Sequence, residues 1–219
     1  MRGQGELERF VGRRRAGRAR PGRVLLLGLT FLLLATIALT PALAHEGASV
    51  KRGFLSGVVH PLIGVDHLLA MVAVGVWGAF LGRPLVVVLP VIFPVVMAGG
   101  GLLGIAGVPM PPIELGIALS VVVLGSAIGA AYKAPVWLAC ALVAVFGLFH
   151  GYAHGQELPA ASDPAAYGIG FILATGALHV AGIAIGLLGD RAGGRAATRV
   201  LGIGIAAAGV YFLVRAVSG

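Results

Sequence analysis

Apolar stretches recur along the chain at a length of about 20 residues, which is what an α-helix needs to cross the hydrocarbon core of a bilayer. No other feature of the sequence constrains the fold as strongly. Hydrophobic residues make up 58% of the chain and charged residues only 11%, whereas a soluble globular protein carries roughly 25% charged residues. The pattern therefore predicts one all-α, polytopic membrane domain.

Turn signals such as Pro84, GVPMPP, KAP and GDRAGG separate these stretches. Six transmembrane helices are predicted, at residues 53–82, 85–106, 113–131, 135–154, 167–189 and 198–216. The connections are short, so neighbouring helices should run antiparallel. Glycine is frequent inside the predicted helices, as in GGGLLGIAG and GIGIAAAG. In apolar helices this favours close packing through small residues, and the sequence predicts a six-helix bundle.

Residues 1–44 have the pattern of a secretory signal peptide. Half of the sixteen Lys and Arg residues lie before residue 24, and the apolar run VLLLGLTFLLLATIALT follows them. Ala42-Leu43-Ala44 then matches an A-x-A cleavage site. We expect cleavage after Ala44, with retention of the run as an anchor as the alternative, and a six-span domain at 45–219. A basic end can indicate nucleic-acid binding, but one that adjoins an apolar run indicates topology instead, and no nucleic-acid partner is expected.

Secretory targeting and the charges of the loops predict the same orientation of the chain in the membrane. Secretory targeting places His45 outside, and counting helices then puts the loop that contains Glu157 and Asp163 outside as well. The basic loop residues predicted to lie inside are Arg83, Lys133, Arg191, Arg195 and Arg199. Because cytoplasmic loops are enriched in Lys and Arg, the sequence predicts a mature N-terminus on the outer side of the membrane.

The stretch HPLIGVDHLLAM, residues 60–71, places ionisable side chains inside the first predicted helix. Asp66 lies near the middle of that helix, where a charge costs about 2.5–3.5 kcal/mol on insertion scales and is normally turned inward and partnered. A structural hydrogen bond between helices is one interpretation, and a ligand or ion pathway is the other. His60, Gly64, His67 and Met71 fall on one stripe of a helix, so this face is expected to be buried in the bundle.

His60 and His67 cannot bind one metal ion from a regular helix. Their separation would be about 10 Å, and an imidazole nitrogen lies only about 2 Å from a bound metal. Pro61 and Gly64 lie between the two histidines and are residues at which helices kink. Either the helix is distorted here, or the two histidines are successive stations on a path.

The stretch FHGYAHGQE, residues 149–157, forms a second group at the end of the fourth predicted helix. His150 and His154 are four residues apart, a spacing at which two histidines can chelate one metal ion, and Glu157 can add an oxygen ligand or orient a histidine. Ordinary interfacial hydrogen bonding is the alternative. His179, in the fifth predicted helix, and His45, at the mature N-terminus, are further candidate ligands, although a lone buried histidine is more often a core residue.

The types of candidate ligand narrow the choice of metal ion. Imidazole and carboxylate donors suit nickel, cobalt, zinc, copper and iron. Cys140 is the single cysteine and is expected to be a small core residue, so thiolate selection of soft ions is not expected. Met71 is a candidate soft donor, with core packing as its alternative. Nickel and cobalt fit best with a site that must release its ion. Zinc and copper are the alternative metals. No permanent cofactor is expected.

These two motifs together resemble the HupE/UreJ family of nickel permeases. The resemblance depends on His60-x5-Asp66-His67 in the first mature helix and on FHGYAHGQE in the fourth, and it covers residues 45–219. It implies a non-enzymatic secondary transporter of Ni²⁺, or of Co²⁺ in some members, in the bacterial inner membrane. The metal would supply hydrogenase or urease maturation, and the partners would be the divalent ion and membrane lipid.

The resulting hypothesis is a cation path with no ATPase. An ion would be collected at His150, His154 and Glu157, with His45 as a further donor, and would pass to the first helix near His179. The stations in the first helix would be His60, Asp66 and His67. The chain has no G-x-x-x-x-G-K-[ST] motif, so transport should be passive or coupled to an ion gradient.

Three other functions fit parts of the pattern. An intramembrane hydrolase needs an activated nucleophile beside a base, and Ser126 in LGSAIGA is the serine considered for that role. A haem-binding electron carrier would use paired histidines as axial ligands. A metal sensor or metallochaperone would bind the ion without transporting it. The sequence does not indicate an oligomeric state.

Overall fold

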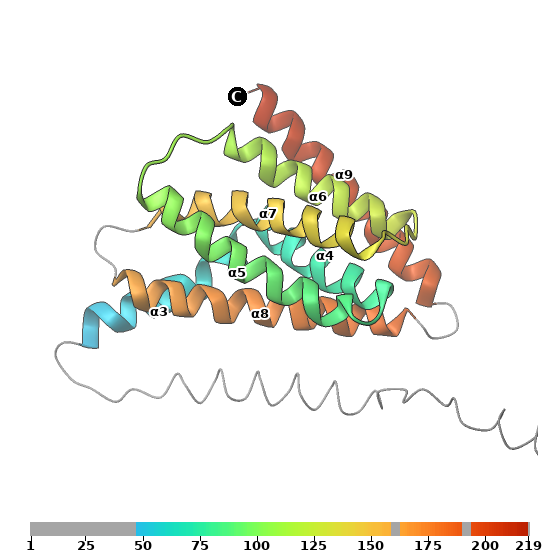
Figure 1. The fold of residues 1–219 in the computed structure, drawn as a ribbon, viewed down its shortest axis with the longest axis horizontal. Coiled ribbons are helices and arrows are strands. Elements are labelled where there is room, and N and C mark those ends of the chain that lie inside the picture. Colours follow the sequence, from blue (N-terminus) through green and yellow to red (C-terminus); the bar gives the residue numbers. More distant parts are fainter. Residues whose placement is uncertain (1–46, 159–162, 190–193, 219) are drawn as a thin grey trace, which may run out of the picture.

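A computed structural model describes residues 47–158, 163–189 and 194–218, and in these ranges every regular element is an α-helix (Figure 1). The predicted signal peptide, its cleavage site and His45 lie outside the described residues. The helices are α3 (Gly47–Ile63), α4 (Val65–Leu81), α5 (Leu85–Ile105), α6 (Ile113–Gly129), α7 (Val136–Gln156), α8 (Pro164–Leu188) and α9 (Gly194–Ser218).

Four of these helices, α5, α7, α8 and α9, are long and apolar enough to cross a membrane. The bent pair α3–α4 raises the number to five if it is one broken span, and α6 is a shorter apolar helix of 17 residues. The protein is therefore a multi-pass membrane protein. Helices occupy all six predicted stretches, although a total of six spans stays a prediction.

The first predicted span, residues 53–82, is not one continuous helix, and of the two alternatives left open for it the distorted helix is the one observed. The chain bends by 82° between α3 and α4. Gly64 leaves the helical conformation, with φ −71° and ψ 102°, and its N–H lies 3.5 Å from the carbonyl of His60. The N–H of His67 donates instead to the Asp66 carboxylate at 2.8 Å. The polar side chain thus satisfies a backbone group that the break deprives of its helical acceptor.

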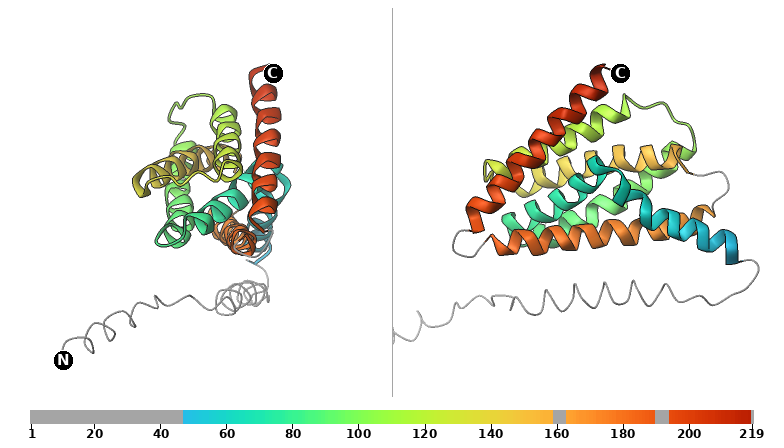
Figure 2. Two further views of the ribbon diagram at one scale, coloured as in Figure 1. Left: turned by 90° about the vertical axis from the view of Figure 1, so that its right-hand side faces the viewer. Right: turned by 180° about the vertical axis from the view of Figure 1, so that it is seen from behind.

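Helices that are distant in sequence pair closely across the bundle. The most extensive contacts join α5 to α7, α6 to α9, and α8 to both α3 and α4. The α6–α9 pair lies at one edge of the bundle and α3 and α8 at the opposite edge, with α4, α5 and α7 between them (Figures 1 and 2).

Glycine permits these close approaches. A Cβ atom added to Gly151 of α7 would collide with the backbone carbonyl of Met97 in α5, and one added to Gly182 of α8 would collide with that of Val72 in α4. The backbones touch at both places, which agrees with the predicted packing through small residues.

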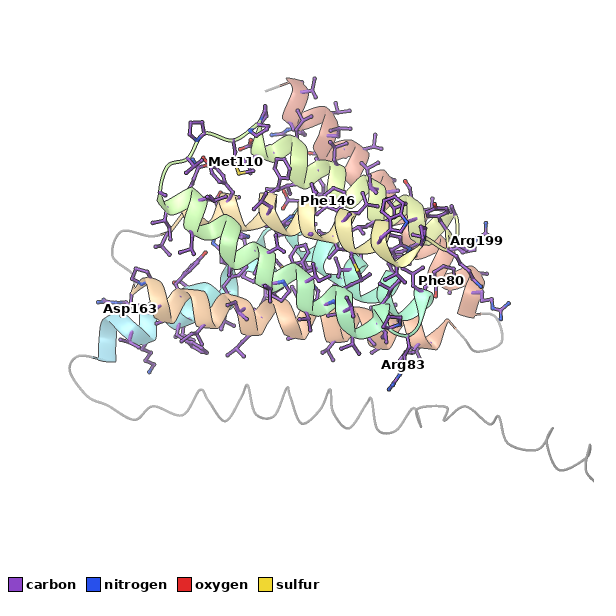
Figure 3. All side chains as sticks on the ribbon, viewed as in Figure 1. Phe80, Arg83, Met110, Phe146, Asp163 and Arg199 are labelled. Carbon is purple, nitrogen blue, oxygen red and sulfur yellow. The ribbon has the colours of Figure 1, made fainter. Side chains whose placement is uncertain are left out.

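Loop charges differ between the two ends of the bundle, although Lys51 and Arg52 of α3 lie at the acidic end. Asp163 lies at one end, with Arg83 and Arg199 at the other (Figure 3). The carboxylate of Asp163 accepts a 2.8 Å hydrogen bond from the N–H of Ala166 and so caps α8. At the basic end, Nε of Arg199 donates to the carbonyl of Gly129 at the end of α6, at 3.0 Å. The separation of charge agrees with the predicted loop assignment, while the orientation in the membrane stays a prediction.

Candidate metal centre

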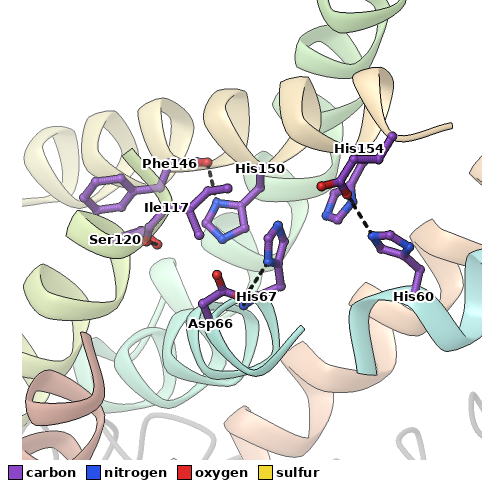
Figure 4. Close-up of polar contacts among 9 residues, drawn as sticks. His60, Asp66, His67, Ile117, Ser120, Phe146, His150 and His154 are labelled. Atoms are coloured by element: carbon purple, nitrogen blue, oxygen red, sulfur yellow. Dashed lines mark hydrogen bonds and ion pairs between the residues drawn. The ribbon is translucent and has the colours of Figure 1, made fainter. Parts of the chain in front are cut away.

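The break at Gly64 brings His60 and His67 to a common neighbour. His60 extends from the end of α3 and His67 from the first turn of α4, and both face α7 (Figure 4). The ring of His154 lies 4.8 Å from that of His60 and 4.5 Å from that of His67, between ring centroids. The helix is therefore distorted, and both histidines lie beside one imidazole of α7.

Three side chains at this point lie close enough together to be candidate ligands of one metal ion. Candidate donor atoms of His60, His154 and Glu157 all lie within 4.8 Å of one another. Oε2 of Glu157 is 3.2 Å from Nε2 of His60 and 3.8 Å from Nδ1 of His154. Ligands that share one first-row metal are roughly 3 Å apart, because each is about 2 Å from the ion. Small side-chain adjustments would therefore let all three bind one ion.

A second set of donors lies deeper, at His67 and His150, whose ring centroids are 4.8 Å apart. Nδ1 of His67 pairs with the Asp66 carboxylate at 2.8 Å, and Nδ1 of His150 pairs with the carbonyl of Phe146 at 2.9 Å. Because both oxygens are acceptors, each Nδ1 carries the proton, and each Nε2 is left with a free lone pair. Histidines that bind metals are commonly oriented by such a partner on the other nitrogen.

The free nitrogens of these histidines are buried without partners. Nε2 of His67, Nε2 of His150 and both ring nitrogens of His154 have no hydrogen bond within the described part of the chain. His150 is completely buried and His154 is 6% exposed. An unsatisfied buried polar atom costs about 1–3 kcal/mol. A cation that accepts one lone pair from each ring would leave only the N–H of His154 without a partner.

A cavity of about 230 Å³ opens beside His67. It is lined by Asp66, His67, Ile113, Glu114, Ile117, Ala153, Gln156 and Glu157. Glu114 and Glu157 are exposed, and the His67 side chain is only 12% exposed. The cavity therefore leads from an acidic, solvent-accessible rim toward buried nitrogens.

Sequence reasoning missed Glu114. It lies in the first turn of α6, where an acid is ordinarily explained by the positive end of the helix dipole. The predicted topology could have identified Glu114, because it places the start of α6 at the same end of the bundle as Glu157.

Two aromatic residues of α8 were also missed. The ring of Phe171 lies 4.2 Å from that of His154, and the ring of Tyr167 lies 6.0 Å from that of His60. Both are buried. They form a wall behind the two histidines and restrict the positions that the imidazoles can adopt. Aromatic residues in an apolar helix give no periodic signal that separates such a wall from ordinary core packing.

The remaining candidates lie apart from this cluster. His179 is buried in α8, and the ring of Phe93 lies 5.3 Å from its ring and 5.3 Å from that of His150. Met71 is completely buried in the hydrophobic core, which matches the packing role considered for it. Ser126, the serine considered for a hydrolase, is exposed on α6.

Comparison with known proteins agrees with both histidine motifs. A model of the HupE/UreJ protein family matches residues 32–212, which include the two motifs. The chain belongs to the HupE/UreJ family. Protein HupE of Rhizobium leguminosarum bv. viciae is 44% identical over 182 residues, which cover 83% of this chain and 95% of the relative. No solved structure matches the chain. Membership of this transporter family confirms the resemblance inferred from sequence and argues against an enzyme.

Proposed function

We propose that this HupE/UreJ protein is a secondary permease that carries Ni²⁺, or Co²⁺, across the bacterial inner membrane into the cytoplasm. The observation that carries the proposal is the meeting of imidazoles from both sides of the α3–α4 break with those of α7. Several of their nitrogens are buried without partners. Such a set offers a divalent cation a substitute for part of its hydration shell.

Capture takes place at the acidic rim. Glu114 and Glu157 attract a divalent cation to the cavity electrostatically. His60, His154 and Glu157 then replace some of its water ligands, since their donor atoms already lie close together. The carboxylate reduces the net charge of the bound ion before it leaves bulk water.

Transfer inward uses His154 as a shared ligand. Its ring contacts His60 on the outer side and His67 on the inner side. An ion can therefore exchange His60 and Glu157 for His67 and His150 without losing all protein ligands at once. Asp66 stays hydrogen-bonded to His67 and compensates positive charge where the dielectric constant is low.

Donor type supports nickel or cobalt as cargo. The cluster supplies nitrogen and oxygen atoms and no thiolate, which disfavours a site for soft ions. A transport site must also release its ion, so binding has to be moderate. The transported ion is a substrate, and no permanent cofactor takes part in the proposal.

Uptake of radioactive nickel into cells that lack other nickel transporters tests the proposal. Asp66→Asn should abolish uptake while the protein still inserts into the membrane, because the amide cannot compensate the charge of the ion. Asp163→Asn is the matched control, since asparagine also caps helices and this residue belongs to the cap of α8. Wild-type uptake by the Asp66→Asn variant would contradict the role assigned to Asp66.

Competition and reconstitution complete the test. Cobalt should compete with nickel more strongly than zinc or copper does if the cargo is assigned correctly. Purified protein in liposomes should produce metal flux across the bilayer. Binding without flux would identify a sensor or metallochaperone and would overturn the permease proposal.

A further inference from the structure

Helix α8 carries two buried polar side chains that the proposed capture site does not use. Thr175 and His179 are four residues apart and share one face of the helix. Thr175 is 0% exposed and His179 is 1% exposed. The hydroxyl of Thr175 and both ring nitrogens of His179 have no hydrogen-bond partner in the described part of the chain. Threonine in a helix usually bonds to a carbonyl of its own helix, so this pair is unusual.

Helix α5 presents a freed carbonyl to the same place. It contains Pro90 and Pro94, and Pro94 has no N–H, so the carbonyl of Pro90 lacks its normal helical donor. The imidazole of His179 faces the carbonyl of Pro90 without completing a hydrogen bond to it. The imidazole of His179 and the carbonyl of Pro90 thus lie together between α5 and α8, and the hydroxyl of Thr175 lies one turn earlier on the same face of α8.

This inner group is separate from the capture site. The ring of Phe93 stands between His150 and His179 and contacts both edge-to-face. The backbone at His179 packs against Gly75 of α4, which is eight residues beyond His67. At the helical rise per residue this places the inner group roughly 12 Å further along α4.

We propose that His179, Thr175 and the carbonyl of Pro90 form a second, deeper binding station for the divalent cation. This inference rests on the proposed permease function. The ion reaches the inner station after it leaves His67 and His150. All three donors are uncharged, and none is a carboxylate, so they bind the ion more weakly than the capture site does. Weak binding suits an intermediate position from which the ion must move on.

Core packing is the competing explanation for His179. Edge-to-face contact with Phe93 would then be its whole role, and the unpaired atoms would be a tolerated cost. The two explanations differ in what the hydroxyl of Thr175 does. A packing role depends only on the shape of the Thr175 side chain, whereas a cation site depends on its hydroxyl oxygen.

Equilibrium binding of Co²⁺ to the full-length purified protein separates the two explanations, together with ⁶³Ni uptake by cells. Thr175→Val preserves shape and removes the oxygen, while His179→Gln keeps a polar side chain and removes the imidazole. Each variant should bind one equivalent of Co²⁺ fewer than wild type and should lose about tenfold or more of the uptake rate. The absorption bands of Co²⁺ at the capture site should remain.

Ser120→Ala is the matched control. Ser120 is also completely buried, but its hydroxyl already donates to the carbonyl of Ile117 at 2.6 Å. Removal of this hydroxyl should change neither the number of bound ions nor uptake. If His179→Gln does not fold, Thr175→Val alone decides the matter.

Unchanged stoichiometry in Thr175→Val and His179→Gln would overturn the inner station, whatever their uptake rates. The permease proposal would survive that result, because wild-type protein would still transport nickel. If wild-type protein fails to transport any divalent ion, the permease function and the inner station both fail.

Discussion

The outer and inner polar groups of this bundle differ in charge and in how the chain builds them. The outer group contains Asp66 and Glu157 together with four imidazoles, and it lies beside an open cavity. The inner pair, Thr175 and His179, is uncharged and lies behind Phe93. A group that takes an ion from water needs negative charge and access, whereas one that passes it on needs neither.

Backbone geometry differs in the same way. The outer group depends on a broken helix, because only the 82° bend at Gly64 brings His60 and His67 to one face of α7. The inner pair lies on the unbroken helix α8. Its proposed backbone ligand is the carbonyl of Pro90 in α5, which Pro94 leaves without a helical N–H. Irregular backbone at membrane depth is tolerated where it lines a cavity, and the cavity adjoins the break.

The largest effect is expected from His154→Ala, which would remove the imidazole shared by both halves of the outer group. Uptake of ⁶³Ni should fall about a hundredfold. His60→Ala should be milder, because His67, His150 and His154 remain as ligands. Equal losses of uptake in the two variants would show that His154 is not shared between the capture and transfer positions, and the distinction between these positions would fail.

An intermediate effect is expected from Gly75→Ala, which alters the contact between α4 and the backbone at His179. The added methyl would collide with the carbonyl of His179 and should lower the free energy of unfolding by about 1–3 kcal/mol. Thermal unfolding in detergent measures the change. Gly168→Ala on α8 is the control, since a Cβ there meets no atom within 4 Å.

The outcome of Gly75→Ala also separates the two groups functionally. Uptake should fall while Co²⁺ still binds at the capture site, because the collision lies at the level of the inner pair. Loss of the capture-site spectrum would show that the outer and inner groups are one mechanical unit.

The smallest effect is expected from Glu114→Gln at the rim of the cavity. The side chain is exposed and has no place among the three clustered ligands, so its contribution is long-range attraction. The KM for nickel should rise by up to about tenfold with kcat unchanged, and the increase should shrink at high ionic strength. A fall in kcat would instead make Glu114 a ligand.

Local sequence predicted the parts of the site that a single helix decides. The spacing of His154 and Glu157 predicted that these two act together, and their side chains lie together at the end of α7. His150, predicted to join them, lies beside His67 instead. Local sequence also identified Asp66 as an acid that needs a partner, and the partner is His67, although the Asp66 side chain is 33% exposed beside the cavity. The family prediction, made from two short motifs, is confirmed.

Features that join different helices were not predictable in this way. The pattern of residues 60–71 is consistent with either a regular or a broken helix, because Pro61 and Gly64 permit a break without requiring one. Phe171 belongs to the site only because α8 packs beside α3 and α4, and Glu114 only because α6 packs beside α4 and α7. Apolar composition shows that a helix is buried or faces lipid, but it does not show which neighbour a side chain meets.

By itself the sequence determined an apolar helical membrane protein whose ionisable side chains had to be turned inward, because exposure to lipid is too costly. Tertiary structure alone decided which of these side chains meet. Backbone contacts at glycines set the distances between helices, and the bend at Gly64 redirects one histidine toward α7. Convergence of donors from α3, α4 and α7 is a property of packing between distant segments, and local periodicity carries no information about it.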